Sequence, residues 1–388
     1  MGLAKSFTIA DFKDLHFIWL VNEGDNSWLT SNTPNSSEIL TVPSKKNIVK
    51  PVAQIKFLIR KIYPLYYILN YIRYQFLSDY SIPEAPPIIQ KVDYDLIHFP
   101  VQFGFKTSRP NIYQPHDLQH FHLPKNFTKL DILFRKKIYL KMMQQASVIV
   151  VGTNWTKIDV QNYYPDYAQK ICNIPVWCEP LVQRNSYEDF INPGEYIFYP
   201  AMNWPHKNHF RLVEAFAEVI RSGLNLKLIL SGSGLESNKD LHNLIRDKNL
   251  NSNVKIVGLV STADLFLYYK HAKLVVVPSL FESESLPIWE AFTLGVPVVA
   301  SNIPTIVDQV QNAAVLFDPL SITSIASEIS YVLSNPEIQL DLVNKGFERI
   351  KKFTAENSAL GYRLVYRKAS NLSEDYQDKN WQKYGFRF

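Results

Sequence analysis

The chain has 388 residues, of which 46% are hydrophobic and 20% charged, a composition that excludes a disordered or fibrous protein and fits a soluble globular one. Its length is more than one hydrophobic core usually supports and suits two domains. The formal net charge of +5 is compatible with an anionic ligand or an anionic membrane surface but requires neither, and we expect no nucleic-acid partner.

The N-terminus and the cysteines predict a cytoplasmic protein. Cys172 and Cys178 do not have the spacing of a metal or redox motif, which favours a reducing compartment. The N-terminal sequence MGLAKSFTIADFKD lacks the apolar core of a signal peptide. No run approaches the roughly 20 apolar residues that a membrane-spanning helix requires.

The first half of the sequence is aromatic and irregular. Short apolar runs predict strands at His16–Val21, Tyr94–Pro100 and Ala146–Gly152. Between the first two strands, the basic and aromatic segment Lys56–Phe76 has two interpretations. It is either an amphipathic helix that lies peripherally on the inner face of the membrane, or a helix packed on a sheet and broken near Pro64. We favour the second.

The second half has a regular alternation of strands and helices. Buried apolar runs predict the strands, and segments with helical periodicity predict the helices between them. In chain order we expect a strand at Glu195–Pro200, a helix at His209–Gly223, strands at Leu226–Gly234 and Asn253–Val260, a helix at Thr262–Ala272, a strand at Lys273–Ser279, a helix at Leu286–Gly295 and a strand at Val296–Ser301. This alternation indicates a parallel, doubly wound sheet, which binds ligands at the carboxyl ends of its strands.

Two loops at those carboxyl ends have residues suited to an anionic ligand. After the strand LKLILS, Gly232 and Gly234 allow the backbone to approach a ligand closely, although a plain strand-to-helix turn explains two isolated glycines better. After the strand EYIFYP, His206 and Lys207 precede a helix start, where a phosphate finds a cation and free N–H groups. A solvated basic loop is an equally good interpretation of this second loop.

A third loop, FESESLPIWEAF at 281–292, has acids on both sides of a predicted helix start. The helix is predicted to begin at Leu286–Pro287, because proline suits a first helical turn. Its unsatisfied N–H groups would hold an anion, while Glu282 and Glu290 would accept hydrogen bonds from hydroxyls on either side. A phosphate group between two polyhydroxyl rings fits this arrangement, which predicts a nucleotide-sugar ligand. The alternative is that Glu282 and Glu284 are merely solvated.

These motifs resemble those of glycosyltransferase family 4, a group of retaining enzymes with the GT-B architecture. The family's Glu-x7-Glu pair and the Gly-x-Pro-Val-Val-Ala segment after it are matched here by Glu282, Leu286, Pro287, Glu290, Ala291, Gly295, Pro297, Val298, Val299 and Ala300. YPAMNWPHKNH at 199–209 and YQPHDLQHFHLPKNF at 113–127 are similar to segments of a mannosyltransferase-like subgroup. The resemblance covers roughly 93–366 and favours a GDP-mannose-like donor.

The resemblance implies roles for the residues of the third loop and for Lys207. Glu290 would bind the ribose hydroxyls, and Glu282 would lie beside the donor sugar. Lys207 would neutralise the diphosphate together with the N–H groups around Ser285 and Leu286. The family needs no metal or other cofactor, because the cation and the helix dipole stabilise the leaving diphosphate.

The resemblance also implies roles for residues at other strand ends. Gly258 and Leu259 would frame the base of the donor, and Gly232 and Gly234 would allow the backbone to approach the donor. His116, in the first domain, would face the donor sugar across the cleft. The alternative for His116 is a loop histidine whose hydrogen bonds are satisfied within its own domain.

The chain departs from the family pattern at several positions. Ser283 and Ser285 replace the two motif glycines, and Glu284 replaces the aromatic residue between them. If the loop needs positive φ, serine is strained there; if it does not, the hydroxyls can help to hold a phosphate. Ala201 stands where many members have an arginine, which leaves more of the phosphate charge to Lys207. We find no first strand followed by a glycine-rich loop, so the first domain is expected to be truncated, divergent or reduced.

The sequence therefore predicts an α/β protein of the GT-B class, with two Rossmann-like domains that face each other across a cleft. We place an acceptor-side domain at 1–185, a nucleotide-sugar domain at 186–352, and a C-terminal helix that crosses back, with its tail, at 353–388. The predicted activity is retaining, metal-independent transfer of a hexosyl group from a nucleotide diphosphate sugar to a hydroxyl of a glycan or lipid-linked acceptor. The alternatives are a catalytically idle nucleotide-sugar-binding subunit and a GT-B epimerase or phosphorylase.

Overall fold

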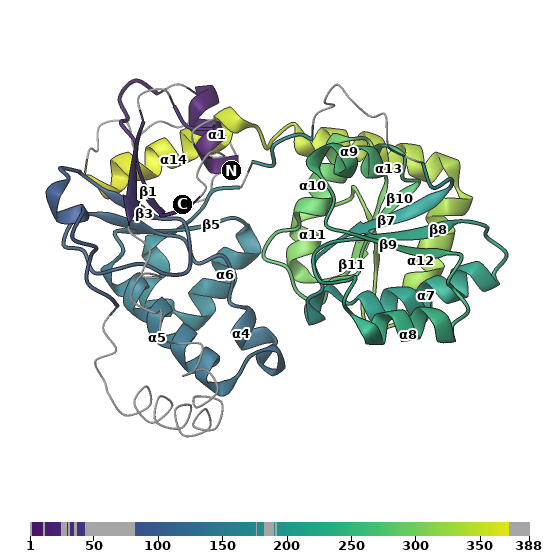
Figure 1. The fold of residues 1–388 in the computed structure, drawn as a ribbon. Coiled ribbons are helices and arrows are strands. Elements are labelled where there is room, and N and C mark those ends of the chain that lie inside the picture. The colour runs from purple at the N-terminus through teal and green to yellow at the C-terminus, as the bar shows by residue number, and fades with distance from the viewer. Residues whose placement is uncertain are drawn as a thin grey trace. The chain divides into compact units, whose positions relative to one another are not determined.

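The computed structural model describes residues 2–10, 12–24, 29, 32–34, 37–42, 82–175, 177–181, 190 and 192–371. Contacts divide the chain into unit 1, which comprises Met1–Trp177 and Ala355–Phe388, and unit 2, which comprises Cys178–Thr354. The basic segment Lys56–Phe76 lies outside the described residues. Each unit is an α/β fold (Figure 1) and is described by itself. The domain limits inferred from the sequence stay predictions.

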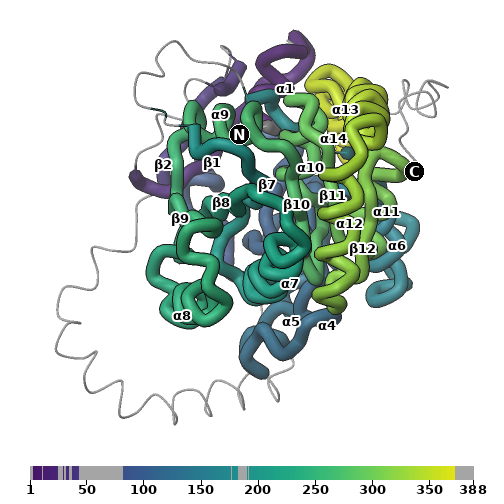
Figure 2. The backbone as a smooth tube through the Cα atoms, turned by 90° about the vertical axis from the view of Figure 1, so that its right-hand side faces the viewer, coloured from purple at the N-terminus to yellow at the C-terminus, as the bar shows by residue number. Residues whose placement is uncertain are grey.

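Unit 2 is built on a six-stranded parallel sheet. Its strands are β7 (Tyr196–Pro200), β8 (Lys227–Ser231), β9 (Val254–Gly258), β10 (Leu274–Val277), β11 (Val298–Ser301) and β12 (Val315–Phe317). They lie in the order β12-β11-β10-β7-β8-β9, which can be followed across the sheet in Figure 2. The chain winds outward from β7 to β9 and then outward in the opposite direction from β10 to β12. The doubly wound sheet is confirmed, and its winding reverses between β7 and β10, where such sheets bind ligands.

Helices cover both faces of this sheet (Figure 1). One face has α7 (His209–Arg221), α8 (Lys239–Asp247) and α12 (Ile322–Ser334), and the other has α9 (Thr262–Lys270), α10 (Leu286–Thr293) and α13 (Pro336–Ile350). The 3-10 turn η5 (Pro205–Lys207) precedes α7, and α11 (Pro304–Val310) joins β11 to β12. Every residue of β10 and β11 is buried, as expected for strands covered on both faces.

Unit 1 has a four-stranded parallel sheet. Its strands β3 (Ile97–Phe99), β4 (Asn111–Tyr113), β5 (Val148–Val151) and β6 (Ile171–Asn173) lie in that order. A separate parallel pair is formed by β1 (Ile18–Asn22) and β2 (Glu38–Val42). The helical elements are α1 (Gly2–Ala10), η2 (Ile89–Lys91), α4 (Gln119–His122), η3 (Pro124–Asn126), α5 (Lys129–Gln145), α6 (Asn154–Tyr163), η4 (Pro165–Lys170) and α14 (Ala355–Ala369).

The core of unit 1 follows the alternation of side chains along β5. Val148 and Val150 belong to a cluster with residues of α1 and α14, whereas Ile149 and Val151 belong to a second cluster with residues of α5. The C-terminal helix α14 is therefore part of unit 1. No helix in the described part of the chain is long and apolar enough to cross a membrane. The cytoplasmic location and the membrane contact stay predictions.

Asn208 ties together the ends of three strands in unit 2. It precedes α7 with a left-handed backbone (φ 62°) and is 7% exposed. Its side-chain amide donates to the carbonyl oxygens of Pro278 and Pro319, each at 2.9 Å, in the segments that follow β10 and β12. Arg211 donates to the Oδ1 of Asn208 at 2.7 Å. These bonds hold the loop after β7 against the loop after β10.

We expect Asn208→Ala to lower the free energy of unfolding by about 3 kcal/mol. Two interior hydrogen bonds are lost at about 1 kcal/mol each, and alanine tolerates the left-handed backbone less well by about 1 kcal/mol. The matched control is Asn249→Ala, because Asn249 has the same backbone conformation (φ 58°) at an exposed position. Denaturant unfolding of both variants measures the difference. Equal losses would show that the backbone conformation, and not the two bonds, gives Asn208 its effect.

Candidate functional site

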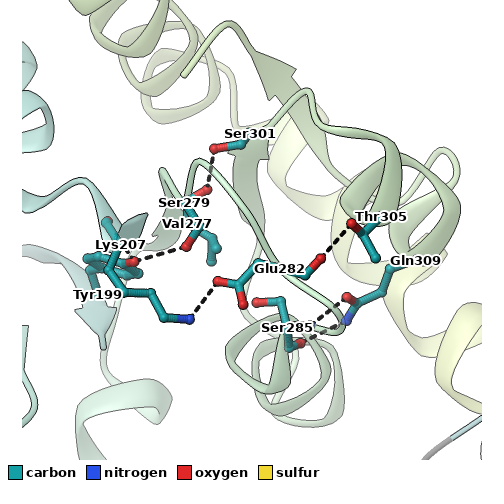
Figure 3. Close-up of polar contacts among 9 residues, drawn as sticks. All are labelled: Tyr199, Lys207, Val277, Ser279, Glu282, Ser285, Ser301, Thr305 and Gln309. Atoms are coloured by element: carbon teal, nitrogen blue, oxygen red, sulfur yellow. Dashed lines mark hydrogen bonds and ion pairs between the residues drawn. The ribbon is translucent and has the colours of Figure 1, made fainter. Parts of the chain in front are cut away.

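The candidate site lies where the winding of the unit 2 sheet reverses. The loop after β7 carries Lys207 and the loop after β10 carries Glu282, and these two strands are neighbours in the sheet. Lys207 Nζ lies 2.7 Å from Glu282 Oε1 (Figure 3), and the two side chains are 15% and 8% exposed. The interpretations of Lys207 and Glu282 as solvated surface residues are therefore wrong. Because water is largely excluded, their charges interact more strongly than at an open surface.

Hydrogen bonds from three segments fix the loops around this ion pair (Figure 3). The Tyr199 hydroxyl, at the end of β7, donates to the carbonyl oxygen of Lys207 at 2.9 Å and lies 3.2 Å from the Ser279 hydroxyl. Thr305, in α11, donates to the carbonyl oxygen of Glu282 at 2.6 Å. The backbone that carries both charged side chains is thus held by residues of β7, the loop after β10 and α11.

The main chain of Ser285, directly before α10, is bonded to α11. Ser285 N donates to Gln309 Oε1 at 2.9 Å, and Gln309 Nε2 donates to Ser285 O at 2.8 Å (Figure 3). The N–H of Ser285 is thus bonded to a side chain in the ligand-free protein, and its predicted contact with a phosphate stays a prediction. The Ser285 hydroxyl is buried and has no hydrogen-bond partner among the described residues. Leu286, which begins α10, is 48% exposed.

The serines that replace the motif glycines cause no backbone strain. Ser285 has φ −102°, and Ser283 is not among the residues with positive φ. The strained alternative is excluded, which leaves the serine hydroxyls as groups that can hold an anion.

Glu290 lies in α10, where its Oε2 accepts a hydrogen bond from the Tyr269 hydroxyl of α9 at 2.5 Å. Burial raises the pKa of the Glu290 carboxyl, and the bond from Tyr269 opposes that shift. The carboxyl is therefore oriented by α9 before any ligand arrives. Its predicted contact with a ribose stays a prediction.

Glu284 is bonded within unit 2, so its interpretation as a solvated residue is wrong. Its Oε1 accepts a hydrogen bond from Trp289 Nε1 at 2.8 Å. Burial raises the pKa of the Glu284 carboxyl to about 8, with the Trp289 bond as a smaller opposing effect. At neutral pH this carboxyl is mostly protonated, so it adds little negative charge beside Glu282.

The histidines of the loop after β7 are uncharged at neutral pH. Burial, with a smaller effect of the nearby Lys207 charge, lowers the pKa of His206 to about 4. Burial likewise lowers the pKa of His209 to about 4. Lys207 is therefore the positively charged side chain of residues 201–209 at neutral pH.

The predicted glycines lie at the carboxyl ends of β8 and β9. A Cβ atom on Gly232 would lie 2.2 Å from the carbonyl oxygen of Ala201, so only glycine fits there. Gly234 and Gly258 have φ of +83° and +66°, which favours glycine. Leu259 follows β9 and is 80% exposed. Their contact with a base or phosphate stays a prediction.

His116 lies in unit 1, in the segment after β4. It is exposed, and its Nε2 lies 2.9 Å from the carbonyl oxygen of Pro100. This contact fits a hydrogen-bonded loop histidine, and the predicted position of His116 opposite the donor stays a prediction. No cluster of His, Cys, Asp or Glu side chains that could hold a metal ion occurs within the described ranges.

Comparison with known proteins identifies the class of the unit 2 fold and site. The family model described as Glycosyl transferases group 1 matches residues 188–349. The match includes the loops after β7 and β10, which carry Lys207 and Glu282. Residues 188–349 are therefore a domain of the glycosyl transferases group 1 type.

Individual relatives have low sequence identity. The chain is 25% identical over 271 residues to O-antigen chain mannosyltransferase B of Escherichia coli, a match that covers 64% of this chain and 70% of the relative. It is 26% identical over 226 residues to O-antigen chain mannosyltransferase RfbU of Salmonella typhimurium, covering 57% of this chain and 60% of the relative. The Anabaena HepE structure in complex with UDP and glucose has a TM-score of 0.60 at 17% identity, over 89% of this chain and 91% of HepE. The predicted GT-B fold class is confirmed by such structures.

Glu284 is expected to make the stability of unit 2 depend on pH. Its pKa is about 8 in the folded protein and near 4.5 when exposed, so between these values the folded state holds a proton that the unfolded state releases. Stability therefore falls as the pH rises through this range. Glu290, whose pKa is also raised, acts in the same direction. Glu284→Gln should melt close to wild type at pH 5 and at a higher temperature than wild type at pH 8.5.

The control for this experiment is Glu337→Gln, which changes an exposed carboxyl in the first turn of α13. Thermal unfolding of wild type and both variants from pH 5 to pH 8.5 gives the comparison. A difference between Glu284→Gln and wild type that stays constant with pH would contradict a protonated Glu284 in the folded protein.

Proposed function

We propose that this protein is a retaining glycosyltransferase. It moves a hexosyl group, with mannose favoured, from a nucleotide diphosphate sugar to a hydroxyl of a glycan or lipid-linked acceptor. The observation that carries the proposal is the Lys207–Glu282 pair at the reversal point of a doubly wound sheet, beside the Ser285 hydroxyl, which has no partner in the described part of the chain. A cation suits a diphosphate, and an adjacent carboxylate suits sugar hydroxyls. The names of the two O-antigen chain mannosyltransferases support the sugar and the kind of acceptor.

The arriving diphosphate competes with Glu282 for Lys207. In the free protein the ammonium group of Lys207 is bonded to the Glu282 carboxylate at 2.7 Å. When Lys207 turns to the phosphate oxygens, Glu282 becomes free to accept hydrogen bonds from the donor sugar. The Ser285 hydroxyl and the start of α10 add donors and positive potential to the same anion. Glu290 binds the ribose, and His116 of unit 1 faces the donor sugar in this proposal.

The proposed reaction breaks the bond between the anomeric carbon and the diphosphate oxygen. The acceptor oxygen attacks the same face of the sugar, and its proton passes to the departing diphosphate. No nucleophile from the protein is used in this scheme. Lys207 lowers the barrier because it lies where negative charge develops, in a site that largely excludes water.

Lys207→Met should weaken the binding of GDP or UDP by about 10- to 100-fold and leave guanosine or uridine binding within about twofold. A charge-assisted hydrogen bond to phosphate is worth about 1.5–3 kcal/mol, whereas the nucleoside has no phosphate to lose. Isothermal calorimetry measures both ligands, and Lys239→Met, at an exposed lysine of α8, is the matched control. Equal losses for nucleoside and nucleotide, or no loss for either, would exclude Lys207 as a phosphate ligand.

Transfer activity is expected to survive an excess of EDTA. The positive charge at the leaving group comes from Lys207 and the start of α10 in this proposal, so a divalent cation is not required. Radiolabelled GDP-mannose and UDP-glucose, each with octyl α-mannoside as acceptor, test the reaction, and magnetic resonance of the product gives its anomeric configuration. Loss of turnover on chelation with recovery on adding manganese would contradict the metal-independent mechanism. Donor binding without turnover under any condition would instead support the idle subunit.

A further inference from the structure

We propose that Gln309 is a positioning residue that sets the orientation of Ser285 toward the donor diphosphate, an inference that rests on the proposed function. Gln309 is 3% exposed and lies in α11, whereas Ser285 is 1% exposed and precedes α10. The Gln309 amide accepts from Ser285 N at 2.9 Å and donates to Ser285 O at 2.8 Å. Figure 3 shows the side chain reaching across to this residue.

Gln309 accepts one hydrogen bond from the main chain of Ser285 and donates another to it. Together the two bonds restrict both the rotation of the Ser285 backbone and its distance from Gln309. A glutamine amide offers one acceptor and two donors on a planar group, so it can bond the N–H and the C=O of Ser285 together. An ionised glutamate offers acceptors only and would repel the Ser285 carbonyl. With both main-chain groups held, Gln309 fixes the backbone from which the Ser285 hydroxyl projects. That hydroxyl is a buried polar group with no partner among the described residues, which is the state of a group that awaits a ligand.

Gln309 is itself anchored by α13. Arg349 Nε donates to the carbonyl oxygen of Gln309 at 2.8 Å, and Arg349 Nη2 donates to that of Asp308 at 3.0 Å. These carbonyls belong to the last turn of α11, where a cation satisfies groups that the helix leaves unpaired. The Arg349 guanidinium lies 4.9 Å from the ring centre of Phe353 and 6.0 Å from that of Trp289.

The contacts close into a circuit around the start of α10. Trp289 of α10 packs near Arg349, and its indole N–H donates to Glu284 at 2.8 Å. The circuit therefore runs from Ser285 through Gln309, Arg349 and Trp289 back to Glu284, one residue before Ser285. Among the residues of this circuit, only Ser285 is proposed to contact the donor. Gln309 acts on the donor through Ser285, and breaking its two bonds opens the circuit at the residue nearest the ligand.

This arrangement predicts a selective effect on ligands that carry phosphates. The Ser285 hydroxyl and the start of α10 serve the diphosphate, whereas the base is expected at the end of β9 and the ribose at Glu290, further along α10. If Ser285 is held less firmly, the affinity for a nucleoside diphosphate should fall and the affinity for the nucleoside should not change. If Gln309 serves only the folding of unit 2, its loss would lower both affinities.

The experiment compares wild type, Gln309→Leu and Gln309→Glu by calorimetry with GDP, UDP, guanosine and uridine. We expect Gln309→Leu to bind the preferred nucleoside diphosphate at least about tenfold more weakly, with nucleoside affinity within about twofold of wild type. Gln309→Glu should show the same loss at pH 8 and regain affinity, relative to wild type, as the pH falls to 5.5, because this buried position raises the pKa of the introduced carboxyl and a protonated glutamate again has a donor. The matched control is Gln339→Leu, since Gln339 bonds the carbonyls of Val332 and Leu333 at the end of α12.

The outcomes separate this inference from the proposed function. Wild type that binds neither GDP nor UDP would overturn the proposed function and the inference with it. Wild-type binding together with an unchanged Gln309→Leu would overturn the inference alone, as would equal losses for nucleoside and diphosphate. If circular dichroism shows that Gln309→Leu does not fold, the pH profile of Gln309→Glu decides: a loss that does not change with pH overturns the positioning role.

Discussion

Lys207 and Glu282 are 75 residues apart in the chain, and their charged groups lie 2.7 Å apart because the winding of the unit 2 sheet reverses between β7 and β10. In a sheet wound in one direction, the loops after successive strands are covered by the connecting helices. At the reversal the two connections leave in opposite directions, so the two loops meet over an open edge. Asn208 then locks one loop against the other through the carbonyls that follow β10 and β12. The geometry of the ion pair therefore depends on the strand order.

The charge of the site is balanced before a ligand arrives. At neutral pH, burial keeps His206 uncharged and keeps Glu284 mostly protonated. Lys207 and Glu282 compensate each other, which lessens the cost of burying either charge alone. In the proposed function, a diphosphate that binds Lys207 separates it from Glu282 and leaves the Glu282 carboxylate buried without its cation. Sugar hydroxyls that donate hydrogen bonds to Glu282 reduce the free-energy cost of this buried charge. Donor phosphate and donor sugar are thus expected to bind as one ligand better than as separate parts.

The sequence allowed the elements of unit 2 and the strand-end positions of its site residues to be predicted, because both depend on local patterns. Apolar runs of four or five residues mark β7, β10 and β11, and Gly223, with φ +97°, follows α7 as a helix-ending glycine. Gln309 could not be found this way, since its partner lies 24 residues away and no local spacing indicates the contact. The bond between Glu284 and Trp289 could not be found from the sequence either, because a carboxyl between two serines has the pattern of a solvated loop. Short strands such as β6, with three residues, give too little periodicity to detect.

Ser285 offers a hydroxyl donor at a position where its own N–H is bonded to Gln309. A glycine here would keep only that N–H as a donor, and the Gln309 amide already accepts it. Pro287, in the first turn of α10, has no N–H, which removes another donor from the helix start. A serine adds a hydroxyl at the same place without requiring positive φ, because its φ is −102°. In the proposed function, the Ser285 hydroxyl therefore serves as donor where the main-chain N–H is already bonded, and the proposed anion site depends on the orientation of Ser285 and on the charge of Lys207.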